Sequence, residues 1–287
     1  MQKQKVVLIT GCSSGFGLLT AKMLSTKKDC IVYASMRNLN KKSSLVKSVK
    51  KVKGQVNILK IDVTDPETIK RAVQKIVKEH GTIDVLVNNA GHAIGGFFED
   101  LTDEEIREQI DVNFFGVQNM TREVVPIMHK NKSGRIINIS SIAGLVSYPG
   151  LGAYNTSKWA LEGFSESLRL ELSRFGIKVI LLEPGSFQTK IFDENVKVAN
   201  SAFDFGSKYY AYTKYLMRNR IEKLKNFRGN PERVAKKIVK LIYAKNPCFR
   251  NIIGMDAFAA YYAKRILPFK IFEKLVNSAA FRSMSEK

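Results

Sequence analysis

The sequence predicts an α/β fold: a doubly wound parallel sheet with helices on both faces and a helical C-terminal extension. Short runs rich in Val, Ile and Leu alternate with longer segments of helical length through most of the 287 residues. Strands separated by helices in this way pair in parallel and are buried on both faces. Apolar residues make up 45% of the chain, enough for a sizeable core. No repeat or linker interrupts the pattern, so we expect residues 1–287 to form a single domain.

The predicted strands follow one another along the chain with a helix-length segment after each. They are apolar without clean alternation, as expected for strands covered on both sides. They span residues 6–10, 31–35, 56–61, 84–88, 135–140 and 178–182.

Start and stop signals frame the helices between these strands. Asp65 and Pro66 give an N-cap followed by Pro at the first helical position. Thr102 and Glu105 have the spacing of a capping box, which predicts a long helix running toward Met128. A third helix is predicted over residues 154–175 and ends near a glycine.

The pattern changes after Gly185. We expect residues 186–287 to form a substrate loop and a C-terminal extension rather than a separate domain. Helical periodicity resumes at Pro231, and the last segment, residues 261–281, is apolar and basic at once and is split by a proline. This tail is expected to cover one end of the sheet.

Composition excludes several classes of protein. Three Cys without a C-x-x-C pair cannot form a disulfide framework, and three scattered His leave little for a zinc site, so we expect no metal. The apolar runs are too short for a transmembrane helix, and the first of them is too short for a signal peptide. We therefore expect a soluble, cytoplasmic protein.

The net charge of +21 is concentrated at the two ends of the chain. Residues 1–60 carry +12 and residues 200–287 carry +13, whereas the middle carries −4. A basic surface attracts nucleic acid, anionic lipid or phosphorylated cofactors, but an ordinary solvated lysine-rich face explains the charge equally well. No nucleic-acid motif accompanies it, so we expect no nucleic-acid binding.

A glycine-rich turn follows the first predicted strand. It reads Thr10-Gly-Cys-Ser-Ser-Gly-Phe-Gly17, a G-x-x-x-G-x-G spacing that runs into a helix. Glycine permits the tight turn and lets backbone approach a pyrophosphate at a helix N-terminus. The alternative is a turn that simply ends a strand.

The end of the second strand bears on cofactor choice. Folds that prefer NAD place an acid there to accept from the ribose 2′-hydroxyl, but this chain reads Ser35-Met36-Arg37. A guanidinium pairs with a 2′-phosphate that a carboxylate would repel. Arg37, assisted by Ser13, therefore favours NADP(H) over NAD(H), unless it is an ordinary exposed arginine. Asp62, after the third strand, is expected beside the adenine.

The pair Tyr154-x-x-x-Lys158 predicts acid–base chemistry. Residues i and i+4 share a helix face, and an ammonium beside a phenol favours the phenolate. Such a tyrosine can exchange a proton with a carbinol oxygen as hydride moves. A surface pair is the alternative. Ser141, at the end of a predicted strand, is placed to hydrogen-bond the same oxygen.

Taken together, these residues resemble the short-chain dehydrogenase/reductase family over residues 5 to about 190. The turn looks like the family's T-G-x-x-x-G-x-G motif, residues 88–91 like its N-N-A-G motif, and Pro184-Gly185 with Thr189 like its P-G-x-x-x-T segment. The resemblance implies a Rossmann-type fold with these expected cofactor contacts: Thr10, Gly11, Ser13, Ser14, Gly15, Phe16, Gly17, Arg37, Asp62, Val63, Asn89, Ala90, Gly91, Tyr154, Lys158, Pro184, Gly185 and Thr189.

The same resemblance implies the catalytic set Asn113, Ser141, Tyr154 and Lys158. Lys158 is expected to hold the nicotinamide ribose as well, and the backbone carbonyl of Asn113 to hold a water that relays protons to it. The implied activity is NADP(H)-dependent hydride transfer at CH–OH groups of secondary alcohols and carbonyls. A cofactor-binding regulator or scaffold without catalysis is the alternative from another class.

Within the family, the start of the chain and its extended tail resemble the branch of 17β-hydroxysteroid and retinol dehydrogenases. That branch implies an apolar substrate, steroid-, retinoid- or lipid-like. The usual assembly of the family implies a homodimer or homotetramer, formed through the helices near residues 102–130 and 152–175.

Three residues and the tail have competing interpretations. We expect His92 to be a satisfied loop residue, Trp159 to pack, and Cys12 to be an unreactive turn residue. The tail carries interleaved apolar and basic residues, which is typical of a helix lying in a membrane interface. Closing the substrate pocket or a subunit interface is the alternative. The apolar members are Tyr261, Tyr262, Ile266, Leu267, Phe269, Phe272, Leu275, Val276 and Phe281, and the basic ones are Lys264, Arg265, Lys270, Lys274 and Arg282.

Overall fold

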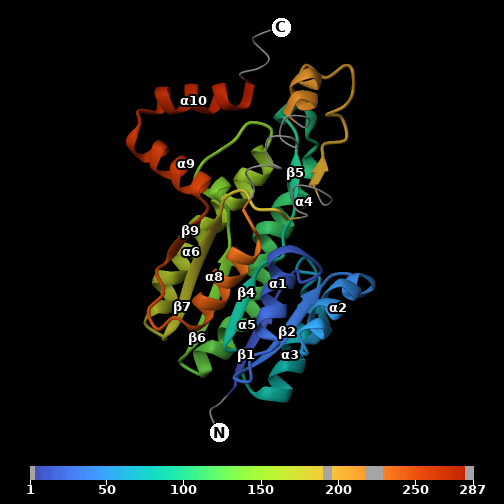
Figure 1. Ribbon diagram of the computed structural model, residues 1–287, viewed down its shortest axis with the longest axis vertical. Coiled ribbons are helices and arrows are strands. Elements are labelled where there is room, and N and C mark those ends of the chain that lie inside the picture. The colour runs from blue at the N-terminus through green and yellow to red at the C-terminus, as the bar shows by residue number, and fades with distance from the viewer. Residues whose placement is uncertain (1–3, 190–195, 217–228, 282–287) are drawn as a thin grey trace.

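The computed structural model describes residues 4–189, 196–216 and 229–281. Seven parallel strands form its main sheet in the order β3-β2-β1-β4-β6-β7-β9 (Figure 1). Their bounds are β1 (Lys5–Ile9), β2 (Cys30–Met36), β3 (Asn57–Lys60), β4 (Val85–Asn88), β6 (Gly134–Ile139), β7 (Ile177–Pro184) and β9 (Arg250–Ile253). The predicted doubly wound α/β fold is confirmed.

The order of the strands places the functional edge of the sheet. The chain builds β1 to β3 in one direction and β4 to β9 in the other, so it reverses between β1 and β4. Open α/β sheets bind ligands outside the carboxyl ends of the strands at such a switch point.

Each face of the sheet carries its own helices and its own core. One face packs α1 (Gly15–Leu24), α2 (Ser43–Lys51) and α8 (Glu232–Tyr243), and the other packs α3 (Pro66–His80), α5 (Gly116–Lys130) and α6 (Gly152–Ser173). Alternate residues of each strand point to opposite faces. In β1, Val7 and Ile9 join the first core while Val6 and Leu8 join the second. Burial on both faces explains why the strands read as continuous apolar runs.

Local signals set the helix ends as the sequence predicts. The Asp65 side chain accepts hydrogen bonds from Glu67 N and Thr68 N at the start of α3. Thr102 and Glu105 form both hydrogen bonds of the capping box that opens α4 (Asp103–Ile110). Gly176, with φ +71°, follows the end of α6.

The helix predicted from Thr102 toward Met128 is not uniform. Between α4 and α5 the chain forms a π-helical stretch, Asp111–Phe115. Gly116 N donates to Asp111 O, five residues back, so one extra residue is accommodated at this point. The sequence carries no proline or glycine pair that predicts this irregularity.

Several short elements were not predicted. β9 extends the sheet beyond β7, and β5 (Ala93–Gly95) pairs in parallel with β8 (Val196–Val198) in a separate two-stranded sheet. Short 3₁₀ turns are η1 (Leu39–Lys42), η2 (Phe98–Asp100) and η4 (Ile142–Gly144). These elements are three or four residues long, too short for periodicity to reveal them.

The tail forms α9 (Met255–Ile266) and α10 (Phe269–Phe281) at the end of the molecule opposite the N-terminus (Figure 1). Its inner side packs on Ile142 and Val146 after β6, through Ala257 and Phe272. The tail therefore covers the carboxyl end of the sheet, as expected. Among the described residues, none of the helices has the length and apolar character needed to cross a bilayer.

Candidate active site

The glycine-rich turn leaves backbone open at the N-terminus of α1. Gly11 has φ +70°, which favours glycine, and a Cβ on Gly17 would lie 2.5 Å from Asn89 Nδ2 and 2.6 Å from the Gly11 carbonyl oxygen. The first turn of α1 carries no acid. This arrangement suits an anion such as a pyrophosphate.

Thr10 and Asn89 hold this turn against the end of β4. Thr10 Oγ1 accepts hydrogen bonds from the backbone N–H groups of Asn89 and Ala90, both at 3.0 Å. Asn89 Nδ2 donates to the carbonyl oxygens of Thr10 at 2.9 Å and Gly11 at 3.1 Å. The predicted N-N-A-G segment thus lies directly against the predicted cofactor turn.

The segment after β7 reaches the same turn. A Cβ on Gly15 would lie 3.8 Å from the Thr189 side chain, and the rings of Phe16 and Phe187 meet edge to face at 6.0 Å. Sequence reasoning missed Asp256 of α9, whose Oδ2 accepts a hydrogen bond from Ser186 N at 2.7 Å. It lies 70 residues from its partner, so spacing gave no signal.

The residues predicted for the adenosine side lie at the same edge of the sheet. Arg37 follows the last residue of β2 and is exposed, and Ser13 is half-buried in the turn. Asp62 Oδ1 accepts from Thr64 N at 3.1 Å and Thr64 Oγ1 at 2.8 Å. The Val63 carbonyl oxygen accepts from Asn119 at 3.1 Å.

Tyr154 and Lys158 lie side by side on α6. The Lys158 Nζ is 5.8 Å from the centroid of the Tyr154 ring, and both residues are buried. Nζ donates a hydrogen bond of 2.9 Å to the carbonyl oxygen of Ile139, the last residue of β6. Burial lowers the pKa of Lys158 to about 8, and the charge of Glu162 opposes this shift. An ammonium so placed beside a phenol favours the phenolate and so lowers the pKa of the tyrosine.

Ser141 follows β6, and the loop that begins at Ser141 contacts Tyr154. Its Oγ accepts a hydrogen bond of 3.1 Å from Ala143 N and caps η4. Tyr154 packs in a small apolar cluster with Ala93, Ala143 and Leu151. The structure therefore brings the Ser141 loop against the Tyr154 side chain.

Asn113 lies in the π-helical stretch and ties three segments together. Its Nδ2 donates to the carbonyl oxygen of His92 at 3.0 Å and to Ser157 Oγ at 3.1 Å, and its Oδ1 accepts from His92 N at 3.1 Å. A Cβ on Gly91 would lie 3.1 Å from Asn113 Oδ1 and 3.9 Å from Lys158 Nζ. Gly91 thus allows Asn113 and Lys158 to come close together.

Two further supporting residues were missed. Ser157 Oγ donates to the Tyr154 carbonyl oxygen at 2.8 Å. Buried Gln109 donates to His92 O at 2.9 Å and accepts from Ile94 N at 2.7 Å. Gln109 precedes Asn113 by four residues on a predicted helix, so the helical spacing could have identified it.

Cys12 and Trp159 behave as packing residues, but His92 is not the satisfied residue expected: among the described residues, its buried Nε2 has no hydrogen-bond partner. Burial lowers the pKa of His92, and the Glu108 carboxylate, 3.6 Å from its Nε2, opposes this shift. Burial raises the pKa of the Cys12 thiol to about 12. Trp159 packs under the Lys264 ammonium, 4.2 Å from its ring centroid.

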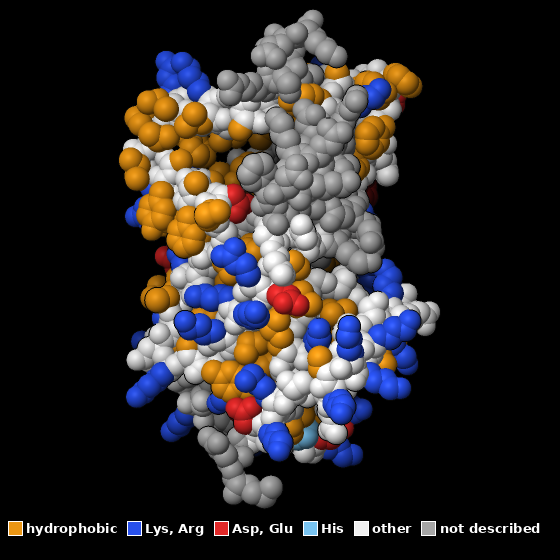
Figure 2. Space-filling model, viewed as in Figure 1, with side chains coloured by type: hydrophobic (Ala, Val, Ile, Leu, Met, Phe, Trp, Pro, Cys, Tyr) orange, Lys and Arg blue, Asp and Glu red, His pale blue; other side chains and the backbone are white. Residues whose placement is uncertain are grey.

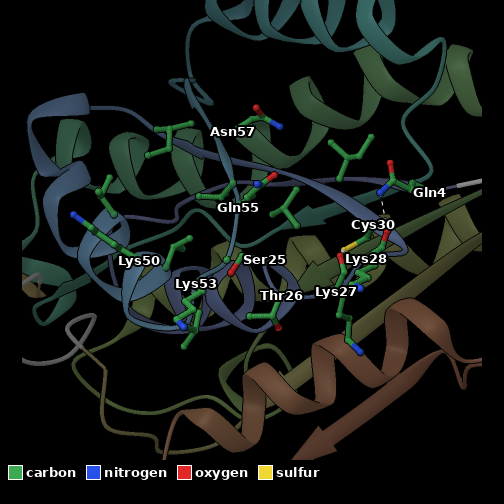
Figure 3. A pocket seen from close by; sticks show the side chains of 18 residues that line it. Gln4, Ser25, Thr26, Lys27, Lys28, Cys30, Lys50, Lys53, Gln55 and Asn57 are labelled. Atoms are coloured by element: carbon green, nitrogen blue, oxygen red, sulfur yellow. Dashed lines mark hydrogen bonds between the residues drawn. The ribbon is translucent and has the colours of Figure 1, made fainter.

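A large open cavity lies away from these residues, at the amino ends of β2 and β3 (Figure 3). Its volume is about 1110 Å³, and its lining includes Lys27, Lys28, Lys50 and Lys53 but none of the predicted site residues. It therefore belongs to the basic N-terminal surface and not to the candidate active site.

Comparison with known proteins places the chain in a family. Residues 5–199 match the family model for short chain dehydrogenases. The chain is 42% identical over 256 residues to a 3-ketodihydrosphingosine reductase of Bacteroides thetaiotaomicron, covering 88% of this chain and 89% of that one.

Two further likenesses bear on branch and fold. The chain is 35% identical to retinol dehydrogenase 8 of Bos taurus, covering 86% of this chain and 80% of that one. A crystal structure of a single-site variant of actinorhodin polyketide ketoreductase with NADPH aligns with a TM-score of 0.73 at 28% identity, covering 88% of this chain and 97% of that one. The predicted resemblance to the retinol dehydrogenase branch is thus confirmed, and the chain belongs to the short-chain dehydrogenase family of oxidoreductases.

Proposed function

We propose that this protein is an NADP(H)-dependent oxidoreductase that transfers hydride between the nicotinamide and an apolar secondary alcohol or ketone. The observation that carries the proposal is the buried Tyr154–Lys158 pair, 5.8 Å from ring centroid to Nζ, beside the Ser141 loop. A regulator that only binds cofactor has no need of a buried lysine in contact with a buried tyrosine, since that burial costs free energy.

The residues at the switch point fit a dinucleotide. The turn at residues 10–17 would hold the pyrophosphate at the N-terminus of α1, Arg37 and Ser13 would hold the 2′-phosphate, and Asp62 and Val63 would border the adenine. Asn89 to Gly91 would border the adenine ribose, and Pro184, Gly185 and Thr189 would contact the nicotinamide carboxamide and the pyrophosphate. Bound there, NADP(H) would supply or accept the hydride. NADPH in the actinorhodin ketoreductase supports this choice of cofactor.

The chain's own residues would manage the proton. In reduction, the Tyr154 hydroxyl donates its proton to the substrate oxygen, and Ser141 Oγ donates a hydrogen bond to the same oxygen. Bringing a phenol from its usual pKa near 10 toward neutrality requires roughly 4 kcal/mol. The Lys158 ammonium supplies part of this by stabilising the phenolate. The backbone carbonyl of Asn113, in the π-helical stretch, would hold the relay water that restores the proton.

The apolar character of the substrate rests on the surroundings of Tyr154. Ala93, Ala143 and Leu151 pack around its ring, with Tyr148 beside them. The names of two relatives, a 3-ketodihydrosphingosine reductase and a retinol dehydrogenase, denote work on lipid-like carbonyls and alcohols. Both facts support a lipid-, steroid- or retinoid-like substrate.

The proposal extends to assembly. The chain acts as one domain, with residues 186–287 as substrate loop and extension, and forms a dimer or tetramer through α4, α5 and α6. Apolar side chains exposed on this surface support the contact: Phe115 is 47% exposed and Leu170 72%.

A membrane surface is the proposed partner of the tail. Four of the nine predicted apolar residues pack inward, because Phe272 is buried and Tyr261, Leu267 and Val276 contact the cluster under α9. Lys264 also points inward, where its Nζ donates to the Leu145 carbonyl oxygen at 2.7 Å. Four others are exposed and form an outer apolar surface over α9 and α10, in the upper left of Figure 2: Tyr262, Ile266, Phe269 and Leu275. Phe281 is half-buried, and its ring meets that of Tyr212 at 5.5 Å. Arg282 lies outside the described residues.

The substitution Tyr154→Phe tests the catalytic proposal. It keeps the ring and removes the titrating oxygen, so turnover of the best ketone in a panel of steroids, retinoids and long-chain lipid ketones should fall by about 10²–10⁴-fold with NADPH. NADPH affinity measured by calorimetry should change little. Tyr243→Phe, the same change on α8, where the hydroxyl donates to Asp29 away from the site, is the control and should stay within about tenfold of the unmodified protein. A Tyr154→Phe variant that keeps its turnover contradicts the mechanism.

A further inference from the structure

Two buried carboxyl groups and one arginine lie beneath the proposed catalytic loop. Glu162 of α6 and Glu183 of β7 have side chains that are 5% and 0% exposed, and the neighbouring Arg250 of β9 is 31% exposed. Arg250 forms an ion pair with Glu162 and lies 3.5 Å from Glu183 Oε1. It also pairs at 2.9 Å with Glu166, whose side chain is 60% exposed.

One arginine does not neutralise two buried carboxylates, so the two groups differ in charge. Burial and the neighbouring Glu162 charge raise the pKa of Glu183 to about 8, so Glu183 is mainly protonated at neutral pH. Burial raises the pKa of Glu162 as well, and the Ser140 hydroxyl and the Arg250 guanidinium beside it oppose this rise. Within the described part of the chain, Glu162 Oε1 has no hydrogen-bond partner. Paired with the Arg250 guanidinium, Glu162 is the buried carboxylate that carries the negative charge of this cluster.

This charge lies next to the catalytic segment. Glu162 follows Lys158 by one helical turn, so the two side chains share a face of α6. A Cβ on Gly144 would lie 2.9 Å from Glu162 Cγ, 2.9 Å from the Lys158 carbonyl oxygen and 3.0 Å from Ser140 Oγ. The Glu162 side chain and the Lys158 backbone thus both lie against Gly144, in the loop that begins with Ser140 and Ser141.

We propose that Glu162, held by Arg250, is a positioning residue that keeps the buried Lys158 side chain charged and oriented toward Tyr154. The inference rests on the catalytic role proposed for Lys158. Without a nearby anion, a fully buried ammonium is driven to lose its proton, and Glu162 is the negative charge that acts against this loss.

Other charged groups around Glu162 do not replace it. Glu183 is mainly neutral, Arg250 is positive, and Lys264 of α9 is positive and hydrogen-bonded to the Leu145 carbonyl oxygen. Glu166 is negative and contacts the same arginine, but it faces solvent, where water and salt screen its charge. Glu166 is therefore the matched control for Glu162, on the same helix and the same partner.

The test is the pH profile of kcat/KM for reduction by NADPH, compared between Glu162→Gln and Glu166→Gln. The alkaline limb reports the coupled Tyr154–Lys158 pair. Removing the Glu162 charge should move this limb to lower pH by about one unit, the size typical of a nearby opposite charge. The affinity for NADPH, measured by calorimetry, should also fall at alkaline pH because Lys158 is proposed to hold the cofactor. The pH of this fall should shift in the same direction. Glu166→Gln should leave both limbs unchanged.

The outcomes separate this inference from the proposed function. If Glu162→Gln lowers the thermal midpoint but leaves both limbs where they are, the cluster only joins α6, β7 and β9, and the inference is wrong. If Glu162→Gln does not fold, Glu162→Asp replaces it as the test. The shorter side chain places the carboxylate one methylene farther from Lys158, so both limbs should shift in the same direction but by less. An unshifted profile in the folded Asp variant also overturns the inference. The proposed function fails separately, if Tyr154→Phe keeps its turnover.

Discussion

Arg37 stands directly after β2, where an acid would favour NAD, and its side chain is exposed to a ligand at the carboxyl edge of the sheet. We expect the unmodified protein to bind NADP(H) clearly more tightly than NAD(H), because a guanidinium pairs with the 2′-phosphate. Arg37→Asp should reverse this preference, measured as the two dissociation constants by calorimetry. Lys28→Asp, the same charge change before the opposite end of β2, should leave the preference intact. Equal affinity of the unmodified protein for both cofactors would rule out this role of Arg37.

Single residues also show how far the sequence predicts the site. The residues in contiguous motifs, such as Tyr154 with Lys158, lie where their spacing implied, because a helix or a strand end fixes their direction. Several residues that support them come from distant segments. Three of them reach the site only because β7, β9 and α9 pack together: Asp256, Arg250 and Glu183. Their local sequence does not predict this placement.

Among the elements, β9 is the main one that the sequence did not predict. It has four residues, follows a segment without periodicity, and is a strand only because β7 pairs with it through Leu181 to Pro184. Glu183 lies in this pairing and accepts a hydrogen bond from Asn251 N at 2.7 Å. The longer elements, by contrast, were predictable from period and caps, as the capping box of α4 and the Asp65 cap of α3 show.

The buried Glu183 makes the β7–β9 joint sensitive to pH. Its pKa is about 8 in the folded protein and in the ordinary Glu range when unfolded, so the folded state binds more protons between those values. The stability that protonated Glu183 contributes to the fold is therefore fully present at acidic pH and is lost as the pH rises toward 8. Glu183→Gln mimics the neutral acid and should reduce the fall in the urea midpoint between about pH 5 and pH 8. Exposed Glu171→Gln should not, and an equally steep fall in both variants would contradict this account.

At the scale of the whole molecule, α9 places one apolar stripe inward and another outward. Met255, Phe258, Tyr262 and Ile266 recur at helical spacing and are 87%, 45%, 52% and 75% exposed. Phe269, Ile271 and Leu275 continue this outer surface on α10, and Arg265, Lys270 and Lys274 lie among them. The helix α9 begins beside Gly185 at the carboxyl edge of the sheet. Docking of this surface on a bilayer would therefore bring the site close to the membrane in which an apolar substrate dissolves. Basic residues beside apolar ones favour an anionic leaflet by about 1 kcal/mol each.

Vesicle co-sedimentation tests this docking. We expect the protein to bind phosphatidylglycerol vesicles at low salt and not phosphatidylcholine vesicles. Phe258→Glu combined with Ile266→Glu removes about 3 kcal/mol of apolar burial, so the partition coefficient should fall about a hundredfold. Val46→Glu, on α2 and 41% exposed, should bind as the unmodified protein does. If the unmodified protein does not bind, or if the double variant instead lowers the mass measured by light scattering without lipid, the outer surface belongs to a second copy of the chain rather than to a membrane.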